Sequence, residues 1–520
     1  MGLRSIVRRM LGTTRREDPS PSRDPFGVYA SKSIRARYDA ATTTDDNARH
    51  WSNVDSLSAN AAASHDVRQI LRNRSRYETA NNSYAKGIVL TLANNLIGEG
   101  PRLQVQTENR EANEAVERQW SRWSREVNLA AKLRTMAHAK VVDGEAFALL
   151  TNNPNHLHPV ELDLRLVEAE QVHTPDFVPM ENHIDGIRFD AHGNPRSYDV
   201  LKHHPGSDTL DAMEAVVDYS SVAADQVLHL FRVDRPGQQR GLPEIMPAMP
   251  LFAQLRRYTL AVISAAETAA DFAAVLQTRQ GADTSNSFGE DEADAPFAGD
   301  ALPVERGMMV ALPEHYEVGQ IRAEQPTTTY DGFVQTLLRE IARCLLIPYN
   351  VAAGDSSAYN YASGRLDHQT YFKAIDVERG EWGWHLDRLL LAFLDEATLI
   401  PGVLPAGLPP FVDLPHTWLW GGHEHVDPMK EAKAEEIQLA NGTTTLAAIY
   451  GRKGKDWLPE IRQKAIEEAE YEKAKADARE KLGLGPEQDD ASQPGAAADG
   501  KGAAADDQSK SKGEAAETAA

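Results

Sequence analysis

The chain has 520 residues, of which 41% are hydrophobic, and its formal net charge at pH 7 is −22. This length is enough for a large core and about two to four structural units. The acidic balance argues against a globally basic nucleic-acid binder, because such proteins neutralise phosphates with Lys and Arg. An acidic protein can still meet DNA if it lets the DNA move instead of holding it.

Residues 1–45 are rich in Arg, Ser and Thr and show little periodicity, which predicts a flexible basic arm. Arg interrupts every apolar run in the first segment, "MGLRSIVRRMLGTTRRE", so we expect no secretory signal there. Gly2 is compatible with myristoylation, but Ile6 stands where that motif needs Ser or Thr.

A helical region is predicted over residues 64–97, where apolar side chains recur at helical spacing, and Gly98 and Gly100 are expected to end it. The segment "RLQVQT" alternates as a short strand. Residues 108–127 predict an amphipathic helix with three large side chains on one side: Trp120, Trp123 and Val127.

Between residues 144 and 232 the hydrophobic period changes to two. Strands are predicted in "GEAFALLT", "VELDLRLVEA", "DGIRFDAHGNPRSYDVLK" and "QVLHLFRV", and the third contains a hairpin turn at "HGNP". This part of the chain predicts an α+β domain with antiparallel strands.

A long Ala-rich helix is predicted over residues 249–279, and about 30 residues of helix would span roughly 45 Å. Its small side chains would allow neighbouring helices to pack closely. One stripe of this helix carries Leu251, Leu255, Tyr258, Val262, Ala266, Ala269, Ala273 and Leu276.

The acidic segment 281–301 predicts a mobile loop, and "GMMVALPEHYEVGQI" predicts a hairpin around Pro313 and Glu314. A second amphipathic helix is expected from about Thr328 to Leu346, ended by the proline at 348. Its apolar stripe consists of Phe333, Leu337, Ile341 and Leu345.

The strip "VAAGDSSAYNYASGR" is small and polar, and it lies between this helix and a third one predicted over 364–397. The third helix carries Trp382, Leu386, Leu389 and Phe393 in register, which predicts core positions. "LPPFVDLPHTWLW" predicts an extended segment, residues 428–482 predict helices, and 483–520 predict a disordered tail.

The chain contains only weak candidates for a catalytic or metal-binding site. "GDSS" contains Ser356 and Ser357, but no G-x-S-x-G motif surrounds them, and the strip is too soft to preorganise a nucleophile. "GGHEHVDP" has potential metal ligands in a spacing that matches no helical H-E-x-x-H and predicts a surface turn; these are His423, Glu424, His425 and Asp427. The histidines of "NHLH" (155–158) and "HH" (203–204) are expected to be solvated.

No glycine-rich phosphate loop is present, so the sequence gives no positive reason to predict an enzyme, a catalytic residue, a cofactor or a metal. The only cysteine, Cys344, lies in the apolar run "IARCLLIP" and predicts a buried thiol in a reducing compartment. No stretch approaches the about 18 apolar residues of a membrane-spanning helix. A nucleic-acid-processing hydrolase, with its site near 354–357 or 423–427, and a monomeric scaffold or adaptor remain alternatives.

The order of these elements resembles the portal proteins of tailed bacteriophages, specifically the lambda-type portal family. The resemblance covers residues 30–480. Its most specific pieces are "DGEAFALL" (143–150), "FRVDRPGQQRGLPEIMPA" (231–248) and "IPYNVAAGDSSAYNYASGRLDHQTYFKA" (347–374).

The resemblance implies a ring of about twelve copies at one capsid vertex, with a head-to-tail interface. It implies an α+β portal-type subunit with the following parts: a basic arm (1–45), an α+β wing (46–248), stem helices (249–279 and 327–346), a clip between them (280–326), a tunnel loop (347–363), a wing helix with an extended segment (364–427), a helical crown (428–482) and a disordered tail (483–520).

In such a ring the strip would border the DNA channel and make weak contacts that do not depend on base sequence. The residues expected there are Tyr349, Asn350, Gly354, Ser356, Ser357, Tyr359, Asn360 and Tyr361. The expected stem interface contains Ala266, Ala269 and Ala273. At twelve copies the formal charge of 12 × −22, about −260, would repel DNA from most of the surface.

The resemblance also implies the partners: other copies of the chain, the terminase large subunit, a head-tail connector or adaptor protein, the major capsid and scaffolding proteins, and double-stranded DNA passing through the channel. No membrane is expected. The expected location is the virion, at the portal vertex of the capsid, after assembly in the host cytoplasm.

Overall fold

The computed structural model describes residues 45, 48–174, 182–207, 218–271, 275–278, 316–319, 330–357, 360–405, 408–410, 414–422 and 428–482. The chain forms two compact units. The first contains the chain up to Asn94, Arg134–Asn153 and Asp163–Tyr371. The second contains Asn95–Leu133, Pro154–Leu162 and the chain from Phe372 onward. The predicted basic arm, acidic loop and tail, and the histidines at 423 and 425, lie outside the described residues.

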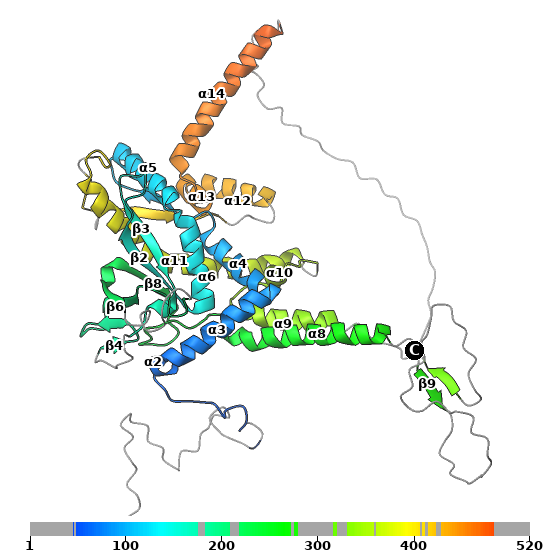
Figure 1. Ribbon diagram of the computed structural model, residues 1–520. Coiled ribbons are helices and arrows are strands. Elements are labelled where there is room, and N and C mark those ends of the chain that lie inside the picture. Colours follow the sequence, from blue (N-terminus) through cyan, green and yellow to red (C-terminus); the bar gives the residue numbers. More distant parts are fainter. Residues whose placement is uncertain are drawn as a thin grey trace, which may run out of the picture. The chain divides into compact units, whose positions relative to one another are not determined.

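The first unit contains two antiparallel sheets that enclose one apolar core (Figure 1). One sheet has the order β3-β2-β8, from Leu162–Val167, Glu145–Asn152 and Val227–Phe231. The other has the order β4-β5-β6-β7, from His183–Ile184, Ile187–Phe189, Pro195–Leu201 and Tyr219–Ala223. Both sheets contribute to the core, whose members include Phe147, Leu149, Ile187, Tyr198, Val200 and Val227. The prediction of an α+β block is therefore confirmed, including a hairpin turn over Asp190–Asn194.

The helices of the first unit begin with the short α2 (Ala59–Ala62) and α3 (His65–Asn81). The helical region predicted over 64–97 consists of two helices, because Asn82 leaves helical geometry between α3 and α4 (Ser83–Ile97). The Asn82 side chain accepts hydrogen bonds from the backbone N–H groups of Tyr84 and Ala85, so it caps the start of α4.

Elements that were not predicted include α6 (Leu129–Asp143), β4 and β7. The periodicity of α6 is obscured because its C-terminal half is buried around its circumference and includes Lys140, which pairs with Glu244 at 3.3 Å. β7 is mostly exposed and has no alternating apolar pattern. Hydrophobic period therefore gave no signal for either element.

The predicted helix over 249–279 is too long. Helix α8 (Met249–Asp271) ends eight positions earlier, and Val275–Thr278 forms strand β9, which pairs antiparallel with β10 (Tyr316–Gly319). The interstrand hydrogen bonds outweigh the weak helical signal of this segment. In the predicted hairpin around Pro313 and Glu314, the turn lies outside the described residues, and the described strand pairs with β9.

Helix α9 (Tyr330–Cys344) confirms the second predicted amphipathic helix, with Leu337 and Ile341 buried, and Leu345 buried just past its end. Phe333, predicted on the same stripe, is instead 47% exposed. It runs beside α8 (Figure 1), and Tyr258 of α8 stacks on Tyr330 with ring centroids 5.6 Å apart. Cys344 is only half-buried; its thiol donates to the Glu244 carbonyl at 3.2 Å, and burial raises the pKa of this thiol.

The second unit is built on α5 (Arg110–Glu126), the C-terminal part of α11 (Tyr361–Leu399) and the two-stranded sheet of β1 (Arg102–Val105) and β11 (His416–Leu419). Trp120, Trp123 and Phe393 pack at centroid distances of 4.9–5.4 Å, which confirms the predicted aromatic core. His158, predicted to be solvated, is only 8% exposed, because it packs near Phe393.

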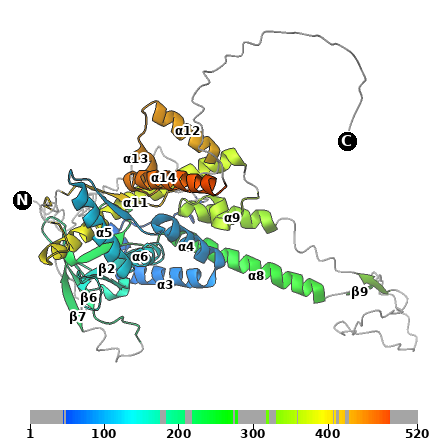
Figure 2. The same ribbon diagram turned by 90° about the horizontal axis from the view of Figure 1, so that it is seen from above.

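The predicted helical region 428–482 is three helices, α12 (Pro428–Ala440), α13 (Leu446–Arg452) and α14 (Trp457–Lys481). Figure 2 shows the same elements from above. Among the described residues, each helix is too short or too polar to cross a membrane.

Candidate functional site

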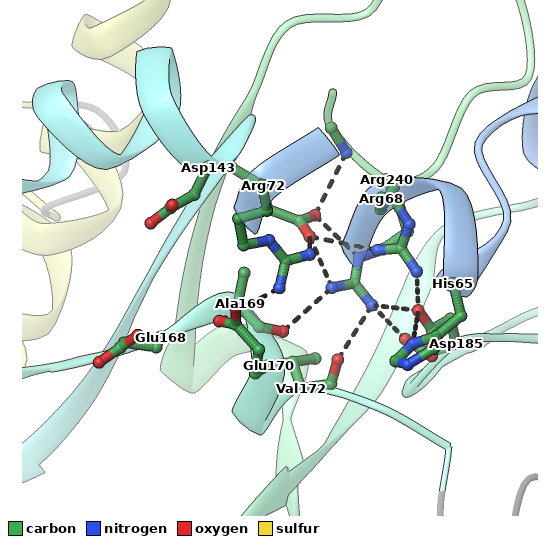
Figure 3. Close-up of polar contacts among 12 residues, drawn as sticks. His65, Arg68, Arg72, Asp143, Glu168, Ala169, Glu170, Val172, Asp185 and Arg240 are labelled. Carbon is green, nitrogen blue, oxygen red and sulfur yellow. Dashed lines mark hydrogen bonds and ion pairs between the residues drawn. The ribbon is translucent and has the colours of Figure 1, made fainter. Parts of the chain in front are cut away.

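Glu145, at the start of β2, lies at the centre of a buried ionic cluster. Figure 3 labels several other members of this cluster, including Arg68, Arg72 and Arg240. Its side chain is completely buried, and its carboxylate accepts two hydrogen bonds from Arg240, at 2.8 Å from Nε and 2.6 Å from Nη2. It also accepts from Arg68 Nη1, His229 Nε2 and the Gly241 N–H, each at 3.2 Å. Burial alone would raise the pKa of Glu145, but the Arg240 charge and these hydrogen bonds hold it well below its usual range.

Each of the five N–H groups of the Arg240 side chain can be matched with a hydrogen-bond acceptor. Besides its bonds to Glu145, it donates to the carbonyl oxygens of Val172 at 3.0 Å, Ala169 at 3.4 Å and Asp185. Its guanidinium also lies over the Phe147 ring, 5.4 Å from the centroid. A buried cation with this complete set of acceptors fixes the surrounding backbone in one arrangement.

Helix α3 contributes three arginines at a spacing of four residues, which places them on one face. Arg68 pairs with Glu145 and with the Asp185 carboxylate. Arg72 Nη1 lies 3.1 Å from Glu170 Oε2, and Arg76 Nε lies 2.6 Å from Asp143 Oδ1. These pairs continue the Glu145 cluster along the helix.

Two glycines bring the backbones of the cluster into direct contact. Gly144 has φ +91°, and a Cβ placed on it would lie 2.4 Å from the carbonyl carbon of Leu242. A Cβ on Gly241 would lie 2.0 Å from the Gly144 carbonyl oxygen. Only residues without a side chain fit here, so "DGEAFALL" and the "RGLPE" part of the 231–248 segment pack against each other.

The side chain of Gln238 and the backbone of Glu244 hold the 231–248 segment in place. Gln238 Oε1 accepts from the backbone of Asp234 at 3.0 Å, and its Nε2 donates to the Arg240 carbonyl at 2.9 Å. The Glu244 N–H donates to the Val141 carbonyl of α6 at 2.9 Å. Because Glu145 and Arg240 are 0% and 2% exposed, a substrate has no access to this cluster, and its role is structural.

Glu168, Glu170 and His204 have ligand atoms within 4.8 Å of one another, as a metal site would require. However, Arg76 pairs with both carboxylates, at 3.1 Å and 2.9 Å, and Arg72 also pairs with Glu170. The arginine charges already balance the carboxylates, so we assign no metal to this group.

Residues 347–363, predicted as a tunnel loop and called the strip from here on, contain helical structure that their composition did not predict. Tyr349–Ala353 form the short helix α10, and Gly354, at φ +67°, ends it in the left-handed conformation. Asp355 Oδ1 then accepts from the Ser357 N–H at 2.9 Å, and Asn360 Oδ1 accepts from the Ser363 N–H at 2.9 Å at the start of α11.

The predicted channel residues fall into different environments. Gly354, Ser356, Ser357 and Asn360 are exposed, and Asn350 is half-buried, with Nδ2 3.0 Å from His368 Nε2. Tyr349 is only 9% exposed, with Arg339 over its ring, so its ring belongs to the core of the first unit. Tyr359 lies outside the described residues, and Tyr361 begins α11.

A cavity of about 690 Å³ adjoins the strip. Its walls come from the α3–α4 corner, α8, α9 and the strip itself, where Tyr349, Ala353, Asp355 and Ser357 line it. Of the predicted stem-interface residues, Ala266 is half-buried on α8, Ala269 is helical, and Ala273 lies outside the described residues.

The sequence did not predict any residue of the cluster as an individual site. It did identify two segments that contribute to the cluster, "DGEAFALL" and "FRVDRPGQQRGLPEIMPA". A signal was present in α3, where Arg68, Arg72 and Arg76 recur every four residues, a spacing that puts charge on one helical face. Nothing in the sequence shows which carboxylates face them.

Comparison with known proteins identifies a matching family and a relative. The family model described as phage portal protein, lambda family, matches residues 44–379. A curated relative, the "Probable portal protein" of Halomonas phage phiHAP-1, is 24% identical over 422 residues, covering 75% of this chain and 78% of that protein.

Two solved structures are similar at a lower level. One is a chain of the virion of a native gene transfer agent particle, with a TM-score of 0.39 and 12% identity over 71% of this chain and 88% of that chain. The other is a chain of the neck of a native particle of this kind computed with C12 symmetry, with a TM-score of 0.36, 12% identity and the same coverage. Similarity at these TM-scores does not establish a shared arrangement of the elements.

Proposed function

This chain belongs to the lambda family of phage portal proteins, and from this membership we propose that it forms a closed ring at one capsid vertex through which DNA is packaged and ejected. The observation that carries the proposal is the family match over residues 44–379, which includes the Glu145 cluster, α8, α9 and the strip. The family is structural and not enzymatic, in agreement with the prediction that the chain is not an enzyme.

We assign parts of the described chain to the portal architecture as follows. The two sheets with α3 and α6 form the wing, α8 and α9 form the stem, and β9 with β10 belongs to the clip. The strip from α10 to the start of α11 borders the channel, and α12, α13 and α14 form the crown. The exposure of Ser356 and Ser357 in the strip supports this assignment, because a channel surface must be accessible to DNA. Tyr349 is buried and is therefore left out of the proposed channel surface.

Exposed apolar side chains mark the surface that a neighbouring copy covers in the ring. On α8, Leu260 is 61% exposed and Ile263 is 48% exposed. On the outer face of α3, Ile70 and Tyr77 are 50% and 55% exposed. Such side chains are costly to leave in water, and a head-to-tail ring buries one such surface on every subunit.

The partners follow from the portal assignment. The ring docks the terminase large subunit and later a head-tail connector, contacts major capsid and scaffolding proteins, and resides in the virion. The net charge of −22 per chain favours passage of double-stranded DNA without sequence-specific binding, because an acidic wall repels the phosphates.

Light scattering after gel filtration tests the central part of the proposal. A ring has a mass many times the 57.2 kDa of one chain. A species that stays at the mass of one chain at every concentration, and also when capsid and scaffolding proteins are present, would instead favour a monomeric scaffold or adaptor.

A further inference from the structure

The buried face of helix α3 is polar. All of its buried residues are polar or charged: Arg68, Arg72, Ser75, Glu78 and Thr79. Its exposed face carries three large apolar side chains, Val67, Ile70 and Tyr77, among polar residues. Directional ion pairs and hydrogen bonds therefore hold α3 against its own subunit more than apolar packing does.

The N-terminal half of α3 is anchored to the sheets of the first unit. Arg68 and Arg72 reach Glu145 and Glu170, at 3.2 Å and 3.1 Å. Both arginine side chains are at most 5% exposed. Arg76 extends the anchor to Asp143, at the end of α6.

The C-terminal end of α3 is anchored to α8. Glu78 accepts two hydrogen bonds from Arg256, both at 3.1 Å, and Arg256 also lies over the Tyr77 ring, 5.1 Å from its centroid. One residue past the helix, Asn82 Nδ2 donates to the Phe252 carbonyl at 3.3 Å. In Figure 2, α3 extends from the sheets toward the start of α8.

The two anchors differ from apolar contacts in how they respond to displacement. An apolar interface is non-directional and tolerates small sliding movements. A buried ion pair is costly to break because each partner would be left as an uncompensated charge. Since Arg72 and Glu78 are six positions apart on one rigid helix, roughly 9 Å along its axis, neither end can slip while the pairs remain intact.

We propose that α3 is a rigid strut that couples the position of α8 to the sheets of the first unit. Movement of α8 is transmitted to the Glu145 cluster through the Arg256–Glu78 pair, and movement of the sheets reaches α8 by the same route. The cavity next to the strip lies at the α8 end of this strut, since Asn81, Asn82 and Arg256 line it. The importance of this coupling for a DNA channel rests on the proposed function, whereas the coupling itself does not.

The test measures a distance across the strut by electron paramagnetic resonance. Spin labels are placed at two exposed positions, Arg257→Cys on α8 and Ser220→Cys on β7, in a Cys344→Ser background. Labelled subunits are diluted with unlabelled chain so that only distances within one subunit contribute. The intact strut is expected to give one narrow distribution.

Weakening of either end should widen this distribution by at least about twofold, because α3 then couples the position of α8 to the sheets less rigidly. Glu78→Gln removes the charge that pairs with Arg256 at the α8 end, and Arg72→Gln removes the charge that pairs with Glu170 at the sheet end. The double variant should widen the distribution by less than the sum of the two single effects, since both contacts act through the same helix. Glu114→Gln on α5, which removes the charge that pairs with Arg110 and with Arg462 of α14, is the control and should leave the width unchanged.

Two results would overturn the proposal: single variants as narrow as the parent, or a double variant whose width is the sum of the two single effects. If Arg72→Gln does not fold, Arg76→Gln replaces it, because Arg76 is 33% exposed and its removal leaves a smaller buried imbalance. Light scattering on the same samples reports ring formation separately, so a failure of the portal assignment is distinguishable from a failure of the strut.

Discussion

Glu145 on β2 and Arg240 on the segment after β8 form a two-point ion pair, with N···O distances of 2.8 Å and 2.6 Å, between positions 95 residues apart in the chain. This pair joins two of the segments that carry the family resemblance. It therefore gives a physical reason for that resemblance: the two segments are complementary halves of one buried joint.

Glu145→Gln should be strongly destabilising. The substitution leaves the buried guanidinium groups of Arg68 and Arg240 without their shared counter-charge, at a cost of about 3–5 kcal/mol in the free energy of unfolding. Urea unfolding followed by circular dichroism measures the loss. Glu114→Gln, an exposed pair, should change stability by less than about 0.5 kcal/mol. Equal stability of the two variants would show that the cluster is not a joint.

Gly241→Ala should also destabilise the first unit, because the new Cβ would lie 2.0 Å from the Gly144 carbonyl oxygen and one backbone must move. Gly332→Ala on α9 is the matched control. Space around Gly332 is open, and Ala favours helix over Gly by about 1 kcal/mol. The melting temperature should fall for the first variant and stay or rise for the second. A Gly241→Ala protein that melts like the parent would contradict the close backbone approach.

Stability of the second unit should depend on pH through Glu117. Burial raises the pKa of this carboxyl to about 7, although it accepts from the Val105 N–H at 2.7 Å. Because the folded pKa is above the unfolded value, this contribution is complete below about pH 4.5 and is lost as pH rises through about 7. Glu117→Gln should remove it.

The measurement is the urea midpoint of parent and variant across this pH range. The difference between the two proteins isolates Glu117 from other titrating groups, and the parent should lose stability relative to the variant as pH increases. A constant difference would place the Glu117 pKa near its ordinary value.

The ring interface should be sensitive to charge on the outward faces of α3 and α8. Ile70→Glu and Ala266→Glu should block ring closure while the subunit still folds, since an unpaired charge buried at each interface costs several kcal/mol. Gln254→Glu, exposed on α8, is the control. Normal rings from both test variants, as seen by light scattering, would place the interface elsewhere.

The strip should require its left-handed glycine for function more than for folding. Gly354→Ala places a side chain at φ +67°, which costs on the order of 1 kcal/mol locally. Subunits should fold and form rings, but DNA packaging should decrease. Gly354→Asn should restore packaging, because Asn tolerates this conformation better. Full packaging by the Ala variant would remove the strip from the channel mechanism.

Hydrophobic periodicity correctly predicted the elements whose buried face is apolar. Trp120, Trp123 and Phe393 could be assigned to a core because α5 and α11 each turn a large apolar stripe inward. The strands β2 and β8 were found for the same reason. In these elements, local pattern and tertiary packing agree.

Periodicity failed where tertiary contacts outweigh local preference. The last residues predicted for α8 form a strand because Tyr316–Gly319 supplies interstrand hydrogen bonds. The strip was predicted to be a loop, yet α10 forms within it, with Tyr349 packed beneath Arg339. Neither partner can be identified from the residues next to it in the chain.

The Glu145 cluster could be predicted only as a pair of unusual segments. Arg240 and Glu145 have the residue types of a buried ion pair, but many exposed pairs in this acidic chain have them too. Burial distinguishes them, and burial here depends on the close contact of Gly144 with Gly241, which is a property of the folded backbone.

The polar buried face of α3 also bears on the order of folding. Its anchors join positions 77, 178 and 170 residues apart: Arg68 to Glu145, Glu78 to Arg256, and Asn82 to Phe252. Because this face of α3 is polar, early apolar collapse does not drive it into the core. The entropy of loop closure also opposes the long-range pairs until the sheets and α8 have assembled. During synthesis, α3 emerges long before Arg240 and Arg256 exist, and its charged face stays in water meanwhile. We therefore expect the docking of α3 to be among the last steps in folding of the subunit.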